Sequence, residues 1–401
     1  MRFRAVSSSL FVAVALTLAC VAEVGVVSAQ QGQPAPGLQR GPRMFDTMDY
    51  KIRVTTVTDE LALPYSLTFL PDGTALVTQL DGRIRIIRNG VLSPTVIGPL
   101  PGLHVNAVPG PPAEGMMDIV IHPRFAANRF LYVAYAKPVQ GGHTVALARG
   151  TFTGTDLVDV KEIFVSNAVA SQNGNAHTRM AFDRDGLLYV AVSHHNQNDY
   201  AQDLKSHGGK VLRLQDDGTP APGNPFIGQA DRLPEIFTYG HRAFHGIALH
   251  PDTGDVWINE HGDEANILKA GNNYGWPYVG LMGMGGGNPT PPAPRGVTLT
   301  EPYVSWVPAV NISGMMFYTG NSFPKWKGNL LVGGLASGQV QRVDFRTTPK
   351  LGSTLFTQVR EALFTGIGQR VRDVRQGPDG SIYFVTYGDT TGTVMRIEPA
   401  S

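Results

Sequence analysis

One structural theme recurs six times along the 401-residue chain and constrains the fold more than any other feature. In each copy, an alternating run of apolar residues leads into a tight turn, often of the Pro-Asp-Gly kind, and a second alternating run follows. The copies are SLTFLPDGTALVTQLDGRIRIIRNG from Ser66, MDIVIHPRFAANRFLYVAYA from Met117, RMAFDRDGLLYVAVSHH from Arg179, HGIALHPDTGDVWINEHG from His245, GMMFYTGNSFPKWKGNLLVGGLASGQVQRVD from Gly314 and DVRQGPDGSIYFVTYGDTTGTVMRIE from Asp373. Alternation with a period of two around Asp-Gly turns predicts β-hairpins.

The spacing of the copies indicates how these hairpins assemble. The copies begin about 50 to 70 residues apart, which suits one four-stranded propeller blade with its loops. A flat sheet of so many strands would expose its edges, whereas radial closure protects them. A pair of β-sandwiches would need a linker, and no Pro/Gly/Ser-rich linker interrupts residues 50–398. We therefore predict an all-β, six-bladed β-propeller as one domain over residues 50–401, with the Pro-rich insertion 283–297 as a surface loop or lid.

The N-terminal segment has the pattern of a secretory signal. Two arginines precede an apolar run that ends in small residues, which predicts a signal peptide over residues 1–29 with cleavage after Ala29. The sole cysteine, Cys20, lies within this segment, so cleavage would leave a mature chain without thiols or disulfides. Cleavage just before Cys20 would instead give a lipid-anchored protein. Residues 30–49 are expected to be a flexible leader, and the mature protein is expected to be secreted or periplasmic, with no transmembrane segment.

The overall charge excludes one class of partner. Lys and Arg number 33 against 32 Asp and Glu, which gives a formal net charge of +1. Nucleic acid and acidic membrane surfaces attract strongly basic faces, so neither is an expected partner.

Histidines concentrate in the third and fourth copies, where they need a functional explanation. They are His177, His194, His195, His207, His241, His245 and His261. In a propeller, loops around the strands ring one mouth of the central channel, which is the expected pocket. Neutral imidazoles there can bind a divalent metal, although no spacing such as His-Glu-x-x-His is present. Alternatively, His177 can act as a base just before a strand, near arginines that grip carboxylates.

Six stretches together resemble one known family. They are PYSLTFLPDGTALVTQLDGRIRII, MDIVIHPRFAANRFLYVAYA, GHRAFHGIALHPDTGDVWINEHG, DEANILKAGNNYGWP, SGMMFYTGNSFPKWKGNLLVG and RVRDVRQGPDGSIYFVT. The chain from about Thr56 to Glu398 resembles the soluble quinoprotein sugar dehydrogenases, the glucose/sorbosone dehydrogenase family. The resemblance implies pyrroloquinoline quinone (PQQ) and Ca²⁺ in the propeller mouth, and oxidation of an aldose or related sugar or polyol hydroxyl. Hydride would pass to PQQ and the electrons to an external acceptor.

The resemblance also implies roles for individual residues. His177 matches the family's base, and Trp306 matches an aromatic side chain near the substrate entrance. The arginines that match cofactor-facing positions are Arg242, Arg370 and Arg372, of which Arg242 is also a catalytic candidate. In relatives, backbone oxygens after the histidine of Glu-His-Gly help to hold Ca²⁺. The corresponding calcium-loop candidates here are Gly262, Asp263, Glu264 and Tyr274.

The chain departs from the family pattern at several polar positions. Gly262 runs directly into Asp263, which shortens the calcium loop, and alanine replaces polar cofactor contacts at Ala113, Ala243 and Ala336. Ser193-His194 stands where an aspartate orients the base. The residues that can compensate are His194, His195 and Glu114. Two other functions therefore stay open: a metal-dependent hydrolase, lactonase or lyase using His177, His194 and His245 or His261, and a non-catalytic carbohydrate- or protein-binding propeller.

Overall fold

The computed structural model describes residues 41–100, 103, 105, 115–171, 176–279, 292–346, 357–388 and 391–400. All of these residues belong to one compact unit, Pro36–Ser401. Several predicted features lie outside the described residues. They are the signal peptide, the first part of the leader, Ala113, Glu114 and most of the insertion 283–297.

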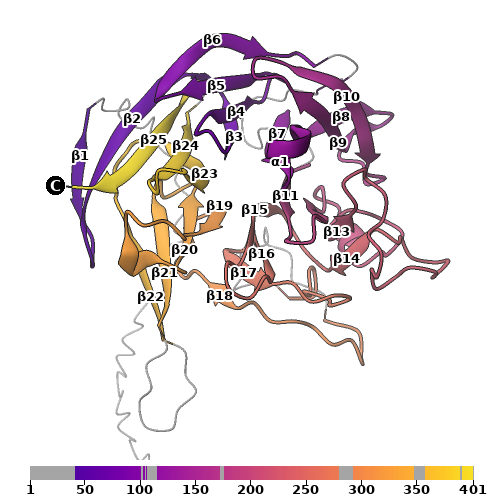
Figure 1. Ribbon diagram of the computed structural model, residues 1–401. Coiled ribbons are helices and arrows are strands. Elements are labelled where there is room, and N and C mark those ends of the chain that lie inside the picture. Colours follow the sequence, from indigo (N-terminus) through magenta and orange to yellow (C-terminus); the bar gives the residue numbers. More distant parts are fainter. Residues whose placement is uncertain are drawn as a thin grey trace, which may run out of the picture. The chain divides into compact units, whose positions relative to one another are not determined.

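Six antiparallel sheets confirm the predicted six-bladed β-propeller (Figure 1). Blade 1 comprises β3 (Pro64–Phe69), β4 (Ala75–Gln79), β5 (Ile84–Arg88) and β6 (Val91–Ile97), and blade 2 comprises β7 (Met116–Ile121), β8 (Phe130–Val139), β9 (Gly142–Phe152) and β10 (Leu157–Val165). Blade 3 comprises β11 (Thr178–Phe182), β12 (Leu188–Val192), β13 (Lys210–Leu214) and β14 (Ile236–Tyr239), and blade 4 comprises β15 (Phe244–Leu249), β16 (Val256–Glu260), β17 (Glu264–Ile267) and β18 (Val304–Ser305). Blade 5 comprises β19 (Ile312–Phe317), β20 (Leu330–Gly334), β21 (Val340–Arg346) and β22 (Thr357–Ala362), and blade 6 comprises β23 (Arg370–Gln376), β24 (Ile382–Tyr387), β25 (Thr391–Pro399), β2 (Lys51–Ala62) and β1 (Arg43–Asp46).

Helical structure is scarce among the described residues. It consists of one α-helical turn, α1 (Phe125–Asn128), and two short 3₁₀ segments, Asn198–Ala201 and Pro324–Trp326. None of the helices in these ranges is long and apolar enough to span a bilayer.

The innermost strands of the blades form a closed ring. These strands are β3, β7, β11, β15, β19 and β23 (Figure 1). Each packs beside the inner strand of the next blade, and β23 packs beside β3 to complete the circle. Residues at the starts of these strands can therefore meet around one central axis.

The ring closes through pairing between the two ends of the fold. Strand β2 pairs antiparallel with β25, so that Thr55 lies opposite Arg396. Strand β1 then pairs with β2, which adds Arg43–Asp46 to the sheet of blade 6 as its outer edge strand. The boundary predicted between leader and propeller at residue 50 is therefore too late. Closure depends on a long-range pairing that the local repeat pattern does not contain.

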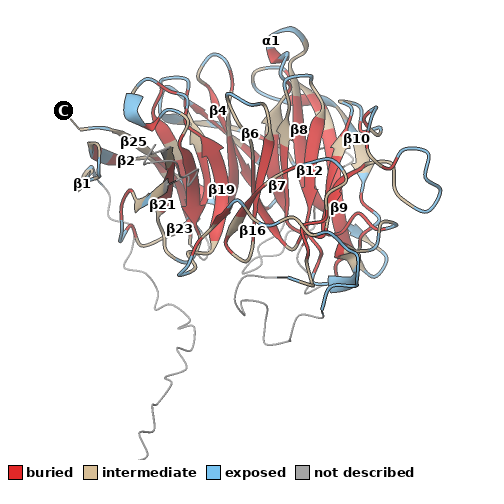
Figure 2. Ribbon diagram, turned by 90° about the horizontal axis from the view of Figure 1, so that it is seen from below, coloured by how far each residue is buried: buried red, intermediate tan, exposed pale blue. Residues whose placement is uncertain are grey.

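Apolar side chains fill the spaces between neighbouring blades, and the strands are largely buried (Figure 2). Separate clusters join successive blades, for example Leu76 of blade 1 with Leu131 of blade 2, and Tyr132 of blade 2 with Met180 of blade 3. The blades also approach closely: a Cβ on Gly246 of β15 would lie 2.9 Å from the backbone nitrogen of Met315 on β19. This packing holds the inner strands at fixed positions around the axis.

Candidate active site in the propeller mouth

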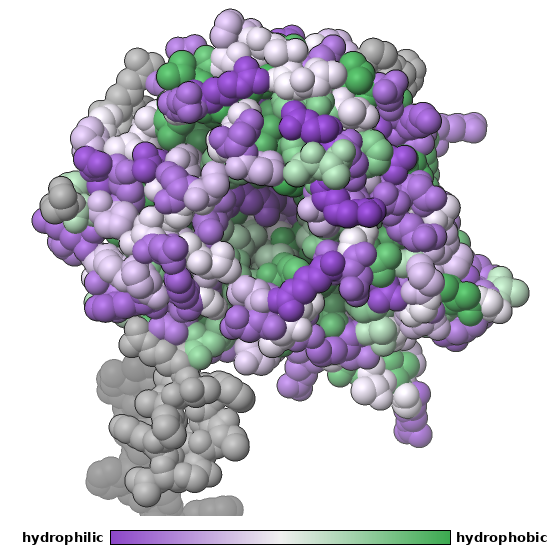
Figure 3. All heavy atoms as spheres, viewed as in Figure 1, coloured by the Kyte–Doolittle hydropathy of each residue, from purple (hydrophilic) through white to green (hydrophobic). Residues whose placement is uncertain are grey.

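The face of the ring seen in Figure 3, on which α1 lies (Figures 1 and 2), is hollowed at its centre. Because α1 follows the end of β7 whereas His177 precedes the start of β11, the candidate site lies at the other end of the ring. His177 immediately precedes β11, one of the inner strands, and its side chain is almost fully buried. Its ring lies 5.2 Å from the ring of His245 and 6.4 Å from that of Tyr65, centroid to centroid. Burial, followed by the positive charge of Arg372, lowers the pKa of His177 well below its ordinary value. His177 is therefore a neutral imidazole near neutral pH, which is the form that can accept a proton.

Two of the predicted arginines reach this site along β23. A guanidinium nitrogen of Arg372 lies 3.5 Å from Nε2 of His177. The Arg372 guanidinium also lies 4.1 Å from the ring centroid of Tyr65 and 5.5 Å from that of Tyr387. Arg370 is more exposed and lies 5.9 Å from the same Tyr387 ring. The aromatic faces thus hold Arg372 beside the proposed base by cation–π contact, whereas the exposed Arg370 contacts the Tyr387 ring alone among the described aromatic rings.

The third arginine, Arg242, lies on the other side of the histidines. The ring of His261 is 6.0 Å from that of His245, and the charge of Arg242 is, after burial, the largest influence on the pKa of His261. The order around the mouth is therefore Arg242, His261, His245, His177 and Arg372. Burial lowers the pKa of Arg242, while the nearby carboxylates of Glu260 and Glu264 oppose that effect. The fold thus brings together five residues that were singled out from the sequence, from Arg242 at one end of the row to Arg372 at the other.

Backbone contacts fix Arg242 in place. Its backbone N–H donates to Oε2 of Glu260 at 2.6 Å, and its carbonyl accepts a bond from the backbone N–H of His194 at 2.9 Å. Nδ1 of His194 lies 2.9 Å from the same carbonyl. The guanidinium stacks over the ring of Trp276 at 4.5 Å, and His194 contacts that ring edge-on at 5.7 Å. His194 therefore supports the arginine from blade 3.

The neighbouring histidine has a different environment. His195 is fully buried in a left-handed backbone conformation, with φ of 57°. Neither of its ring nitrogens makes a hydrogen bond to a described residue. Burial, followed by the charges of His194 and His143, lowers the pKa of His195 to about 3, and that of His194 falls to about 4 through burial and the charge of Arg242. Both imidazoles are neutral across the physiological range.

The predicted calcium loop is braced from within by Asp263. Oδ2 of Asp263 accepts the backbone N–H groups of Val310 and Asn311, and Oδ1 accepts that of Ile312 at 3.1 Å. The carboxylate thereby ties the end of blade 4 to the start of blade 5. Gly262 and Asp263 both have positive φ, 123° and 59°, which lets the shortened loop turn sharply. These three bonds give the Asp263 carboxylate a structural role at the junction of the two blades.

The other calcium-loop candidates also have identified roles. The Tyr274 hydroxyl donates to the carbonyl of Ile267 at 2.6 Å, and its ring stacks on His241 at 4.5 Å. Burial, followed by the Glu260 carboxylate, raises the pKa of Glu264 to about 8. Glu264 is therefore protonated near neutral pH when no metal ion is beside it. A divalent ion would favour its ionised form.

The described part of the chain offers no metal cluster that would support the hydrolase alternative. Within the described ranges, no three His, Cys, Asp or Glu residues are grouped so that they could share a metal ion. His177, His245 and His261 instead form a row of rings beside arginines. Positive charges next to imidazoles oppose cation binding and favour an anion.

Trp306, which the sequence predicted near the substrate entrance, is a buried residue. Its side chain is 4% exposed and packs in the core between blades 4 and 5, with Trp257 and Met315. Its backbone N–H donates to the carbonyl of Asp263 at 2.8 Å. The residue follows the two-residue edge strand β18, whose pattern is too short to predict which way the ring faces. This buried position does not support the expectation that Trp306 lies near the substrate entrance.

Sequence reasoning also missed several residues of the site. Tyr65 and Tyr387 contact the guanidinium of Arg372, and Trp276 lies against that of Arg242. The carboxylate of Glu260 accepts the backbone N–H of Arg242 and lies 3.0 Å from Nδ1 of His241. Asp118 and Asp373 both pair with Arg179. The sequence signal for Asp118 was a carboxylate inside the otherwise apolar strand β7, whereas the arginines around Asp373 in β23 gave no such signal.

Comparisons with known proteins place the chain in a family. Residues 61–396 match the family model described as Glucose / Sorbosone dehydrogenase. The chain belongs to the glucose/sorbosone dehydrogenase family. It is 31% identical to the aldose sugar dehydrogenase YliI of Escherichia coli over 359 residues, which cover 87% of this chain and 93% of that protein. It is 23% identical to quinoprotein glucose dehydrogenase B of Acinetobacter calcoaceticus, with 95% of this chain and 94% of that protein covered.

Solved structures of sugar dehydrogenases share the architecture. A crystal structure of glucose dehydrogenase has a TM-score of 0.75 and 33% identity, covering 87% of this chain and 99% of its own. The PQQ-bound form of aldose sugar dehydrogenase from Streptomyces coelicolor has a TM-score of 0.66 and covers 91% of this chain and all of its own, but its 24% identity shows only the fold. The match to this family confirms the resemblance that the six quoted sequence stretches indicated.

Proposed function

We propose that this family member is an exported, PQQ-dependent dehydrogenase that oxidises the anomeric hydroxyl of an aldose or a related sugar or polyol. One observation carries the proposal: a neutral, buried His177 lies between the guanidinium of Arg372 and the row of His245, His261 and Arg242. A base flanked by cations suits a reaction in which a hydroxyl loses a proton beside an anionic cofactor.

The residues present fit such a cofactor. PQQ carries three carboxylates, and guanidinium groups are the side chains best suited to grip them. In the part of the chain that the structure describes, no carboxylate lies within ion-pair distance of Arg370 or Arg372, and both guanidiniums lie over tyrosine faces. The protonated form of Glu264 further lowers the negative charge near Arg242. When bound, PQQ would supply the electron sink for the hydride from the sugar carbon.

The chain's own contribution is proton transfer and orientation. The His177 imidazole would accept the proton of the sugar hydroxyl. The positive charge of Arg372 opposes protonation of His177, so neutralisation of that charge by a bound carboxylate would raise the proton affinity of the base. The histidine row and Tyr65 keep bulk water away from the base, because His177, His245 and Tyr65 are all nearly fully buried.

Ca²⁺, export and electron transfer belong to the same proposal. The loop from Gly262 to Tyr274 would offer Ca²⁺ its main-chain oxygens and the Glu264 carboxylate, since hard oxygen ligands suit this ion. Export rests on the signal-like residues 1–29, with lipid anchoring at Cys20 as the other outcome. Turnover would need an external acceptor to reoxidise the cofactor. Sequencing the mature N-terminus separates cleavage before Gln30 from cleavage before Cys20.

A cofactor titration tests the proposed function. Purified, chelator-treated protein would be titrated with PQQ, with and without Ca²⁺, by following the quinone absorbance, and dye reduction would then be measured with a panel of aldoses. The expected result is tight binding that depends on Ca²⁺, with sugar-dependent dye reduction that His177→Ala abolishes while PQQ binding persists. Absence of binding at micromolar PQQ would overturn the proposal.

A further inference from the structure

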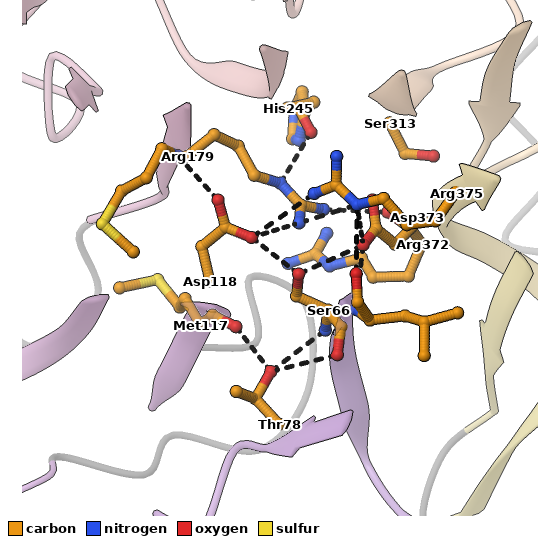
Figure 4. A network of polar contacts seen from close by, with 12 residues as sticks. Ser66, Thr78, Met117, Asp118, Arg179, His245, Ser313, Arg372, Asp373 and Arg375 are labelled. Carbon is orange, nitrogen blue, oxygen red and sulfur yellow. Dashed lines mark hydrogen bonds and ion pairs between the residues drawn. The ribbon is translucent and has the colours of Figure 1, made fainter. Parts of the chain in front are cut away.

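A buried network of charges lies between the inner strands of several blades (Figure 4). A guanidinium nitrogen of Arg179 lies 3.3 Å from Oδ1 of Asp118 and 3.7 Å from Oδ1 of Asp373. Arg375 adds a second guanidinium, with Nε 3.1 Å from Oδ2 of Asp373 and a terminal nitrogen 3.6 Å from Oδ1 of Asp118. Two carboxylates thus face two guanidiniums. This balance permits burial, because each charge has an opposite partner.

The network is assembled from different blades. Asp118 lies on β7, Arg179 on β11, and Asp373 and Arg375 on β23. Backbone N–H groups also converge on the carboxylates: that of Met180 donates to Asp118 at 2.6 Å, and that of Leu67 to Asp373 at 3.0 Å. Blades 1, 2, 3 and 6 therefore meet at one polar centre.

Glycine makes room for this centre at the start of blade 5. A Cβ on Gly314 of β19 would lie 2.1 Å from Oδ1 of Asp373 and 2.7 Å from its Cα. Any larger residue would displace the carboxylate. The close approach of backbone to carboxylate indicates that the position of Asp373 is tightly constrained.

Arg179 connects this network to the mouth through two main-chain carbonyls. Its Nε donates to the carbonyl of His245 at 2.8 Å, and a terminal nitrogen donates to the carbonyl of Arg372 at 2.9 Å. The side chains of these two acceptor residues are those that flank His177. The Arg179 guanidinium also lies 4.8 Å from the ring centroid of Tyr65, which in turn contacts Arg372 at 4.1 Å. One buried side chain thus touches the supports of the base on three inner strands.

We propose that Arg179, held by Asp118 and Asp373, is a positioning residue that sets the places of His245, Arg372 and Tyr65 around His177. This inference rests on the proposed function, because the mouth that it organises is the proposed cofactor site. A buried ion network does not in itself increase stability over well-packed apolar side chains. The bonds from Arg179 to the backbone of two site residues give it a role beyond packing.

The inference predicts specific effects of Arg179→Lys, which keeps the charge but loses the planar fork. Lysine cannot reach both carbonyls and both carboxylates with the same geometry, so Arg372 and His245 should move. PQQ affinity in the presence of Ca²⁺ should fall roughly tenfold or more, as expected for losing one or two buried hydrogen bonds. In the cofactor-free protein, NMR of labelled histidines, assigned with His177→Gln, should show the His177 titration shifted toward its ordinary pKa. Asp118→Asn keeps the shape of the side chain but removes its charge. PQQ affinity and the His177 titration should therefore change in the same directions, but by smaller amounts.

The pKa of His177 depends on the positions of charged and titratable groups on the neighbouring inner strands and loops. The charged and titratable groups around His177 are Tyr65 on β3, Arg179 on β11, His195 after β12, His245 on β15, His261 after β16 and Arg372 on β23. Lysine preserves the positive charge at position 179. A shift in Arg179→Lys would therefore reflect displacement of these groups rather than loss of a charge.

Tyr318→Phe is the matched control, because it removes a similarly buried bond outside this network. The Tyr318 hydroxyl donates to the carbonyl of Gly380 at 2.6 Å, between blades 5 and 6. This variant should lower the thermal midpoint while leaving PQQ affinity and the His177 titration unchanged. The inference is overturned if Arg179→Lys matches wild type in both measurements, or if Tyr318→Phe alters them equally. If wild type itself fails to bind PQQ, the proposed function fails, and the His177 titrations of the two variants still decide the positioning role.

Discussion

A guanidinium nitrogen of Arg372 lies 3.5 Å from Nε2 of His177, although both side chains are nearly fully buried. Two groups that can each carry positive charge are thus held together in a site of low polarity. The arrangement is favourable only while His177 is neutral, and burial together with the Arg372 charge lowers its pKa accordingly. The proposed base is therefore unprotonated and can accept a proton. Its proton affinity stays weak until an anion neutralises the charge of Arg372.

The first prediction concerns this pair. Arg372→Gln removes the largest electrostatic cause of the shift, so the pKa of His177 should rise toward its ordinary value. Histidine NMR on the cofactor-free protein measures the change without any dependence on activity. Arg370→Gln is the matched control, because Arg370 lies on the same strand but is exposed and is not among the causes of the shift. An unchanged His177 titration in Arg372→Gln would contradict the prediction.

The second prediction concerns turnover. His177→Gln should reduce sugar-dependent dye reduction by about 10²- to 10⁴-fold, the usual contribution of a positioned general base. PQQ binding should change little, since the guanidiniums remain. His250→Asn serves as control, because His250 lies in a turn where Nδ1 accepts backbone bonds from Asp252 and Thr253, at 3.3 Å each. Equal losses of activity in the two variants would exclude His177 as the base.

Much of the fold could be predicted from the sequence, because each blade is a local hairpin pattern with its own turn. The closure of blade 6 could not, since the pairing of β2 with β25 joins the two ends of the fold. Likewise, the approach of Arg242 to His261 and of Arg372 to His177 depends on which blades are neighbours in the ring. Local periodicity says nothing about such contacts.

The polar centre shows a second limit of sequence reasoning. Asp118 interrupts the apolar inner strand β7, which signals a buried charge that needs a partner, whereas Asp373 lies among arginines in β23. The sequence does not reveal that Arg179 is the shared partner of both. Asp263 was assigned to calcium by resemblance, but the three N–H groups that its carboxylate accepts become apparent only when blade 5 is placed beside blade 4.

The third prediction concerns stability in acid. The pKa of His195 is lowered to about 3 in the folded chain but is near 6.5 when unfolded. As the pH falls through 6.5 toward 3, the unfolded chain takes up a proton that folded His195 refuses, so stability is lost by up to about 1.4 kcal/mol per pH unit. His195→Asn removes this site, and Asn tolerates the left-handed backbone. Denaturant unfolding at several pH values should show a shallower acid dependence for His195→Asn than for wild type, and parallel curves would contradict the assignment.

The fourth prediction concerns the buried Lys210. Its Nζ donates to the carbonyls of Tyr200 and Gly208, the latter at 2.8 Å, and burial lowers its pKa to about 7. Between pH 7 and 10.5 the unfolded chain holds a proton that the folded chain has released, so this group makes stability rise with pH over that window. Lys210→Met should abolish that rise, as measured by urea unfolding from pH 7 to 10. Lys269→Met is the control, because Lys269 forms an exposed ion pair with Asp255.

The fifth prediction separates bracing from metal binding at Asp263. Its carboxylate accepts the N–H groups of Val310, Asn311 and Ile312, so Asp263→Ala should orphan three donors and cost about 2–4 kcal/mol of unfolding free energy. Asp263→Asn retains acceptor capacity on one oxygen and tolerates the positive φ, so its loss should be smaller. Both losses should appear in Ca²⁺-free buffer. If instead Asp263→Asn is as stable as wild type without Ca²⁺ and loses only the stabilisation that added Ca²⁺ provides, the carboxylate acts as a metal ligand and not as the brace between blades 4 and 5.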